Sequence, residues 1–134
     1  MEKRIQCLLI DDDPEDQDIF MMALESLGPD FTGLGLKDSI DALEKLTSDI
    51  SFAPDFIFLD VNMPKINGVE LLEKIKSLEN LKNTSIFIYT TSWDHRLMEL
   101  CKGLGAKEYL IKPYTFDSLV DCLKDVLIAK VKAE

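Results

Sequence analysis

The stretch LLIDDDPEDQD, residues 8–18, places six carboxylates within eight residues directly after an apolar run. The apolar residues are typical of a buried strand, and a helix is predicted to begin after it, because Asp13 precedes Pro14 as an N-cap precedes a proline at the first helical position. The acids on the first turns of that helix suit its positive end, and we expect them to be mostly solvated: Glu15, Asp16 and Asp18. Asp11 and Asp12, at the end of the strand, need another explanation.

Short apolar runs alternate with longer stretches of helical spacing along the rest of the chain. The runs are CLLI, FIFLD, SIFIYT and EYLIKP, with FTGLGL as a weaker one because two glycines lower its strand propensity. This alternation predicts an α/β domain with a parallel sheet, built from five strand–helix units. We expect residues 1–134 to form a single domain, with no room for a second, output domain.

Two predicted helices carry apolar side chains at helical intervals. The first helix should end near Gly28, and its apolar positions are Ile19, Phe20, Ala23, Leu24 and Leu27. The last should run almost to Glu134, with Phe116, Leu119, Val120, Leu123 and Leu127 on one face.

The charge balance excludes some functions. The chain has 25 acidic and 15 basic residues and a formal net charge of −10, which argues against binding to nucleic acid or to an anionic membrane. No segment has the pattern of a signal peptide or a membrane span, so we expect a cytoplasmic protein. The three cysteines are widely spaced within apolar patterns, which indicates buried small side chains rather than a disulfide or zinc site: Cys7, Cys101 and Cys122.

Polar residues stand where four of the predicted strands end. Asp11 and Asp12 follow the first strand, Asp60 the third, Thr90 the fourth and Lys112 the fifth. The carboxyl ends of parallel strands share one edge of a sheet, where ligands bind. We therefore expect three acids, a hydroxyl and an ammonium group to converge.

Three converging carboxylates would repel one another without a counter-ion. A hard divalent cation with oxygen ligands resolves the conflict, and Mg²⁺ is the expected ion, with Mn²⁺ as an alternative. A carboxylate beside such a cation can attack a phosphoryl group, and Asp60 is the candidate because Asp11 and Asp12 are adjacent as a metal pair. Thr90 can donate to one phosphoryl oxygen and Lys112 can pair with another.

The segments LLIDDDP, FIFLDVNMPKINGVELL, IFIYTTS and GAKEYLIKPY resemble the response regulator receiver domain family and are similar to the chemotaxis regulator. The resemblance covers nearly the whole chain. It implies a doubly wound, flavodoxin-like three-layer sandwich with strand order 2-1-3-4-5. It also implies Asp60 as phosphoacceptor, a metal held by Asp12, Asp60 and the backbone carbonyl of Asn62, and Asp11 acting mainly through water.

The resemblance assigns roles to further residues. Thr90 and Lys112 match the switch hydroxyl and the lysine of the family, and Tyr109 matches an aromatic residue that swings inward on activation. Lys112 and Pro113 match a pair whose peptide bond is often cis, a form accessible before proline. Asn62 and Ser92 stand at positions similar to those that tune the lifetime of the phosphoryl group.

The function implied is regulatory rather than enzymatic. The chain would accept a phosphoryl group from a histidine kinase or a histidine phosphotransfer protein and signal by a conformational shift to a downstream protein. The surface that contacts the downstream protein would be formed by the last two helices and the strand between them. The resemblance is compatible with a monomer or a homodimer.

Three alternatives remain beside this interpretation. Asp11 and Asp13 have the spacing of a haloacid-dehalogenase phosphatase, but Glu15 replaces the Thr or Val usual there. Gly33 and Gly35 do not complete a dinucleotide-binding fingerprint, because its third glycine would fall at Asp38. A receiver-like docking module that works without phosphorylation is the third alternative. Trp93 and His95 receive no role from the sequence.

Overall fold

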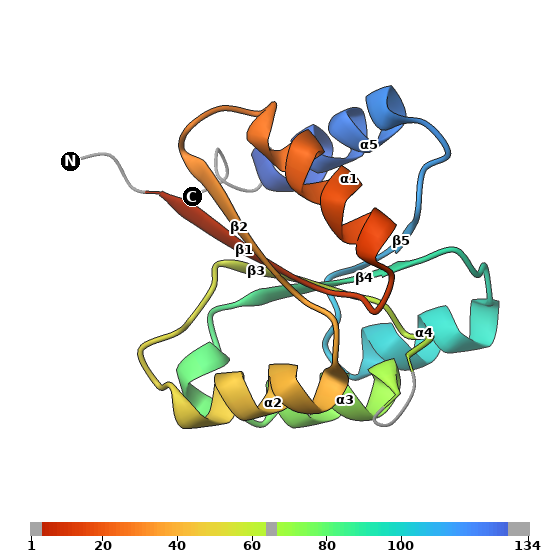
Figure 1. The fold of residues 1–134 in the computed structure, drawn as a ribbon. Coiled ribbons are helices and arrows are strands. Elements are labelled where there is room, and N and C mark those ends of the chain that lie inside the picture. The colour runs from red at the N-terminus through yellow and green to blue at the C-terminus, as the bar shows by residue number, and fades with distance from the viewer. Residues whose placement is uncertain (1–3, 64–66, 129–134) are drawn as a thin grey trace.

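The fold is a central sheet with helices on both faces, and a computed structural model describes residues 4–63 and 67–128 of it (Figure 1). Its strands are β1 (Ile5–Ile10), β2 (Phe31–Leu36), β3 (Phe56–Leu59), β4 (Ser85–Thr90) and β5 (Glu108–Ile111). They pair in parallel in the order β2-β1-β3-β4-β5. The doubly wound topology expected from the resemblance is confirmed, including the glycine-containing second strand.

Helices cover both faces of the sheet (Figure 1). The first layer contains α1 (Pro14–Glu25) and α5 (Phe116–Leu123), which continues as a π-helical turn (Lys124–Ile128). The second contains α2 (Ser39–Ser48), α3 (Gly68–Lys76) and α4 (His95–Gly103), with a short 3₁₀ turn after α3 (Glu79–Leu81). None of the described helices is long and apolar enough to cross a lipid bilayer.

Alternate strand residues divide the core into two parts, because successive side chains point to opposite faces. Aliphatic side chains face α2, α3 and α4: Leu8, Ile10, Ile57, Leu59, Ile86 and Ile88. The other part, under α1 and α5, is rich in aromatic rings: Phe20, Phe56, Phe58, Phe87 and Tyr89. Because both faces are covered, the strands are continuous apolar runs.

The observed start and end of α1 agree closely with those predicted from the sequence. Asp13 is the N-cap of α1, and its carboxylate accepts a hydrogen bond of 2.9 Å from the backbone N–H of Glu15. After α1 the chain turns through Gly28, whose φ of 126° lies in the region that favours glycine. The predicted extension of the last helix toward Glu134 lies partly outside the described residues, which end at Ile128.

Two predicted apolar positions are not in the core. Ile19 is 44% exposed and Phe116 is 41% exposed, whereas their helical neighbours Phe20 and Leu119 are buried. Both lie at the margin of the apolar stripe, where a side chain of either helix can reach solvent. Cys7 and Cys101 are buried and Cys122 is partly buried, and all three are free thiols.

Candidate functional site

Backbone hydrogen bonds bring the strand ends into line at one edge of the sheet. The N–H of Asp60 donates to the carbonyl of Ile10 over 3.0 Å, one residue beyond the last pair of β1 and β3. The N–H of Lys112 donates to the carbonyl of Thr90 over 2.8 Å in the same way at β4 and β5. The residues that follow the strands therefore lie next to one another.

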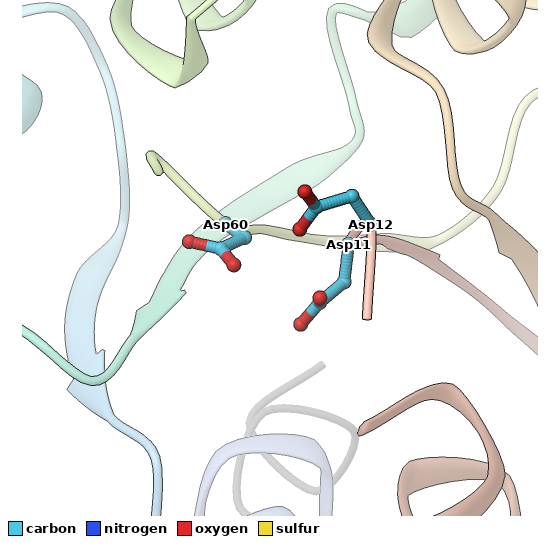
Figure 2. Close-up of side chains that lie close together, drawn as sticks. All are labelled: Asp11, Asp12 and Asp60. Atoms are coloured by element: carbon cyan, nitrogen blue, oxygen red, sulfur yellow. The ribbon is translucent and has the colours of Figure 1, made fainter. Parts of the chain in front are cut away.

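Three carboxylates meet at this edge. Asp11 and Asp12 at the end of β1 and Asp60 at the end of β3 each offer an oxygen within 4.8 Å of the others, and Figure 2 shows the three side chains close together. Asp11 is fully buried and Asp60 is 6% exposed, whereas Asp12 is open to solvent. The predicted convergence of these acids is confirmed.

The donor set fits a hard divalent cation. All three groups offer carboxylate oxygens, the ligands that Mg²⁺ and Mn²⁺ prefer, and one of them faces solvent, from which an ion can enter. Oδ2 of Asp11 is buried and has no partner in hydrogen-bond geometry among the described residues, although the ammonium of Lys112 lies 2.8 Å away. One ammonium group cannot balance three carboxylates, so the cluster still has excess negative charge that a divalent cation can offset.

The ammonium group of Lys112 lies among three acids. Its Nζ is 2.7 Å from Oδ2 of Asp16, 2.8 Å from Oδ2 of Asp11 and 3.2 Å from Oδ2 of Asp60. The contacts with Asp16 and Asp60 have hydrogen-bond geometry. The lysine side chain is only 9% exposed, and its Nζ also lies 5.5 Å from the centre of the Tyr89 ring.

Asp16 corrects one prediction. We expected it to be mostly solvated with the other acids of α1, but its side chain is 31% exposed and carries the shortest contact to Lys112. The sequence held no signal for this pair, because the two residues are 96 positions apart and only the tertiary fold brings α1 close to the residue that follows β5.

Burial and ion pairing shift the pKa values in the site. Burial raises the pKa of Asp11, and the contact with Lys112 and the N–H of Asp13 oppose that shift. Burial lowers the pKa of Lys112, but its contacts with Asp11 and Asp16 and the charge of Asp60 outweigh burial, so the pKa is raised overall. The lysine is therefore a fixed positive charge at neutral pH.

Neutral groups line the other side of Asp60. The backbone N–H of Asn62 donates to Oδ1 of Asp60 over 2.9 Å, and the side-chain amide of Asn62 donates to Oγ1 of Thr90 over 3.1 Å and to Oγ of Ser92 over 3.2 Å. The hydroxyl of Tyr109 donates to the carbonyl of Ser92 over 2.6 Å. Thr90 is fully buried, and Asn62 links its hydroxyl to the carboxylate of Asp60.

The aromatic side chains beside this neutral group are partly exposed. Tyr109 packs edge-on against Trp93, with 6.2 Å between ring centres, and Trp93 is 65% exposed. Burial raises the pKa of Tyr109, which keeps its hydroxyl a donor. His95 is an exposed residue at the start of α4, 3.9 Å from Glu99, and lies outside the site.

Gln17 is a residue of the site that the sequence analysis missed. It is 6% exposed, and its amide nitrogen donates to the carbonyl of Asp11 over 2.9 Å and to that of Leu36 over 3.2 Å. Gly35 makes room for it, since a Cβ there would meet Oε1 of Gln17 at 1.6 Å. The sequence contained a signal for this residue. Gln17 is a polar residue three positions before Phe20, which places it on the apolar face of α1.

The cis peptide bond expected between Lys112 and Pro113 is not present. Every peptide bond among the described residues is trans. The trans form before proline is lower in free energy by about 0.5–1 kcal/mol unless the surroundings favour the cis form. The cis bond that the family resemblance suggested is therefore not found.

Residues 7–124 match the response regulator receiver domain family. The chain belongs to the response regulator receiver domains. Among curated proteins it is 32% identical to the probable C4-dicarboxylate response regulator DctR of Halalkalibacterium halodurans, over 88% of this chain and 49% of that protein. The chain thus spans about half the length of that relative.

Two solved structures show the same fold. The Mn²⁺-bound form of the response regulator Rcp1 is 26% identical, with a TM-score of 0.80 and 91% of each chain covered. The phosphorylated cyanobacterial phytochrome response regulator RcpA is 25% identical, with a TM-score of 0.81, covering 92% of this receiver domain and 91% of that chain. Two-component regulators of these kinds are the proteins that this chain is similar to.

Proposed function

We propose that this receiver domain accepts a phosphoryl group on Asp60 from a histidine kinase or a histidine phosphotransfer protein. One observation carries the proposal: the Asp60 carboxylate lies within 4.8 Å of Asp11 and Asp12 oxygens and 3.2 Å from the Lys112 ammonium. A nucleophilic acid beside a cation-binding pair and a fixed positive charge is what phosphoryl transfer to a carboxylate requires. The membership of the receiver family supports the same function.

The transfer step forms one bond and breaks one. A carboxylate oxygen of Asp60 attacks phosphorus, the P–N bond of the donor phosphohistidine breaks, and the imidazole leaves with the electron pair and takes a proton from water. The product is an acyl phosphate on Asp60. With acetyl phosphate as donor, a P–O bond breaks instead and acetate leaves.

Residues of the chain would hold the new group. Lys112 can transfer its contact with Asp60 to a phosphoryl oxygen, and the buried hydroxyl of Thr90 can donate to another. We propose that Asp11, Asp12, Asp60 and the backbone carbonyl of Asn62 provide the ligands for Mg²⁺, with Asp11 acting mainly through water. When bound, the cation neutralises the charge that develops on the phosphoryl oxygens.

The neutral side of the site, formed by Asn62, Thr90, Ser92 and Tyr109, would transmit the signal. Oγ1 of Thr90 accepts a hydrogen bond from the amide of Asn62, and a movement of Thr90 toward a phosphoryl oxygen would rearrange that bond. The side chain of Tyr109 can then move if its hydroxyl breaks the hydrogen bond to the carbonyl of Ser92. We propose that this movement changes the surface of α4, β5 and α5, where a downstream protein or a second copy of the chain would bind.

The acids that a haloacid-dehalogenase phosphatase would need are not gathered in the carboxylate cluster. Asp13, its second acid, caps α1 through a hydrogen bond to the N–H of Glu15 and is not in the carboxylate cluster. The late acids Asp117, Asp121 and Asp125 lie on α5 and its extension, outside the cluster. A regulatory role therefore explains the site better than turnover of a substrate.

Incubation with acetyl phosphate, with and without Mg²⁺, tests the proposal. Intact mass spectrometry should show one added phosphoryl group on the wild-type protein with Mg²⁺ and none on Asp60→Asn. Asp13→Asn is the matched control, because asparagine also caps a helix and Asp13 is outside the cluster. Equal modification of Asp60→Asn would refute the assignment, and repeated turnover of phosphate esters would favour the phosphatase alternative.

A further inference from the structure

Asp16 joins the site from a different element than the other acids. It lies on the first turn of α1, and its Oδ2 accepts a hydrogen bond of 2.7 Å from Nζ of Lys112, which follows β5. This contact is shorter than those of Lys112 with Asp11 and Asp60, at 2.8 and 3.2 Å. The pair is partly shielded from solvent, with the lysine side chain 9% exposed and the aspartate side chain 31% exposed.

The three acids around Lys112 differ in whether their contact with it can persist during phosphorylation. A lysine ammonium has three N–H donors, and here three carboxylates surround it. Asp11 and Asp60 belong to the cluster that can hold a cation, and Asp60 is also the proposed acceptor. Asp16 lies outside that cluster, so its contact with Lys112 is the one that neither a bound cation nor a phosphoryl group replaces.

We infer that Asp16 is a positioning residue that holds the Lys112 ammonium beside Asp60 before and after phosphorylation. A lysine has a flexible four-carbon side chain, and an anchor that fixes it in advance removes the need to order it when the phosphoryl group arrives. Asp16 also links α1 to the end of β5 through this pair. The inference rests on the proposed function, because positioning matters only if Lys112 contacts a phosphoryl oxygen.

A second explanation of Asp16 must be separated from this one. As an acid in the first turn of α1 it also stabilises the positive end of the helix, and Glu15 stands in the same turn. Glu15 is exposed, and its side chain has no contact with Lys112 among the described residues. Glu15→Gln therefore removes the same helix interaction without touching the anchor.

The experiment compares rates of phosphorylation by acetyl phosphate at saturating Mg²⁺, followed by intact mass. Asp16→Asn should lower the rate constant about 3- to 10-fold, as expected for a displaced catalytic group, while Glu15→Gln stays within about 1.5-fold of the wild type. Asp16→Glu keeps a carboxylate within reach and should recover most of the loss. In a Lys112→Ala background, Asp16→Asn should have no further effect.

Several results would overturn the inference. A wild-type rate for Asp16→Asn would show that the anchor is not used, and an equal loss in Glu15→Gln or in the Lys112→Ala background would show a helix effect. Failure of Asp16→Glu to recover the rate would also count against an anchoring carboxylate. If the wild-type protein takes no phosphoryl group, the proposed function fails together with the inference, whereas the other results leave that function intact.

Discussion

Asp60 lies between two sets of groups that differ in kind. On one side the Lys112 ammonium contacts three carboxylates within 3.2 Å. On the other, amide, hydroxyl and carbonyl groups connect Asn62, Thr90, Ser92 and Tyr109 by neutral hydrogen bonds of 2.6–3.2 Å. Charged contacts in a buried site are roughly twice as strong as neutral ones, so the charged side suits fixed positioning and the neutral side suits rearrangement.

The largest effect should come from breaking the charged side. Lys112→Met should lower the free energy of unfolding by about 3 kcal/mol without Mg²⁺, because it leaves the buried carboxylates of Asp11 and Asp60 without their cation. Added Mg²⁺ should recover part of the loss. Urea unfolding followed by circular dichroism measures both values.

Lys107→Met is the control for this change. Lys107 is exposed just before β5, and a surface substitution of this kind should stay within about 0.5 kcal/mol. If Lys112→Met unfolds at the same urea concentration as the wild type, the charged side does not stabilise the domain.

Alkaline pH should weaken the charged side more gradually. The pKa of Lys112 is raised in the folded protein, since its contacts with Asp11 and Asp16 outweigh burial. A base with a raised pKa stabilises the fold fully below its unfolded pKa, about 10.4 for lysine, and loses that contribution as the pH rises through the folded value. The stability difference between wild type and Lys112→Met should therefore be constant from about pH 7 to 10 and shrink above it.

Urea unfolding of both proteins over a pH series checks this expectation. Taking the difference cancels the titration of groups whose pKa Lys112 does not affect. A difference that already shrinks between about pH 7 and 9 would contradict the raised pKa of Lys112.

A smaller effect is expected where the neutral side is broken at its centre. Thr90→Val keeps the shape of the buried side chain but removes the oxygen that accepts hydrogen bonds from the side-chain amide of Asn62 and the N–H of Ser92. The free energy of unfolding should fall by about 1 kcal/mol, the usual net value of such a bond. Thr90→Ser, which keeps the hydroxyl, is the comparison, and a greater loss in Thr90→Ser than in Thr90→Val would show that packing dominates.

The smallest effect should come from the outer end of the neutral side. Tyr109→Phe removes only the hydrogen bond to the carbonyl of Ser92, in a partly exposed position, and should cost about 0.5 kcal/mol. Fluorescence of Trp93, whose ring contacts Tyr109, should report the freed ring. An effect as large as that of Lys112→Met would remove the distinction between the two sides.

The sequence predicted the parts of the site that follow from local pattern. Each apolar run became a strand, and the acid, hydroxyl or lysine after it reached the common edge because parallel strands end together. The strand order and the role of Tyr109 needed the resemblance to a family. The same resemblance predicted a cis bond after Lys112 that the structure does not have.

Contacts between distant elements could not be predicted in this way. Asp16 was placed with the solvated acids of α1 because nothing near it in the sequence indicates the lysine 96 residues later. Gln17 could have been noticed as a polar residue on an apolar helix face, but its three carbonyl partners depend on how α1 sits on β1 and β2. Tertiary packing decides both.

The fit of Gln17 into the space left by Gly35 limits how this domain can be recombined with its relatives. A chimaera that takes its first helix from this chain and its second strand from another receiver would place a side chain where the glutamine amide must lie, unless the strand also has glycine there. The two segments must therefore be exchanged as a unit, although 18 positions separate their key residues.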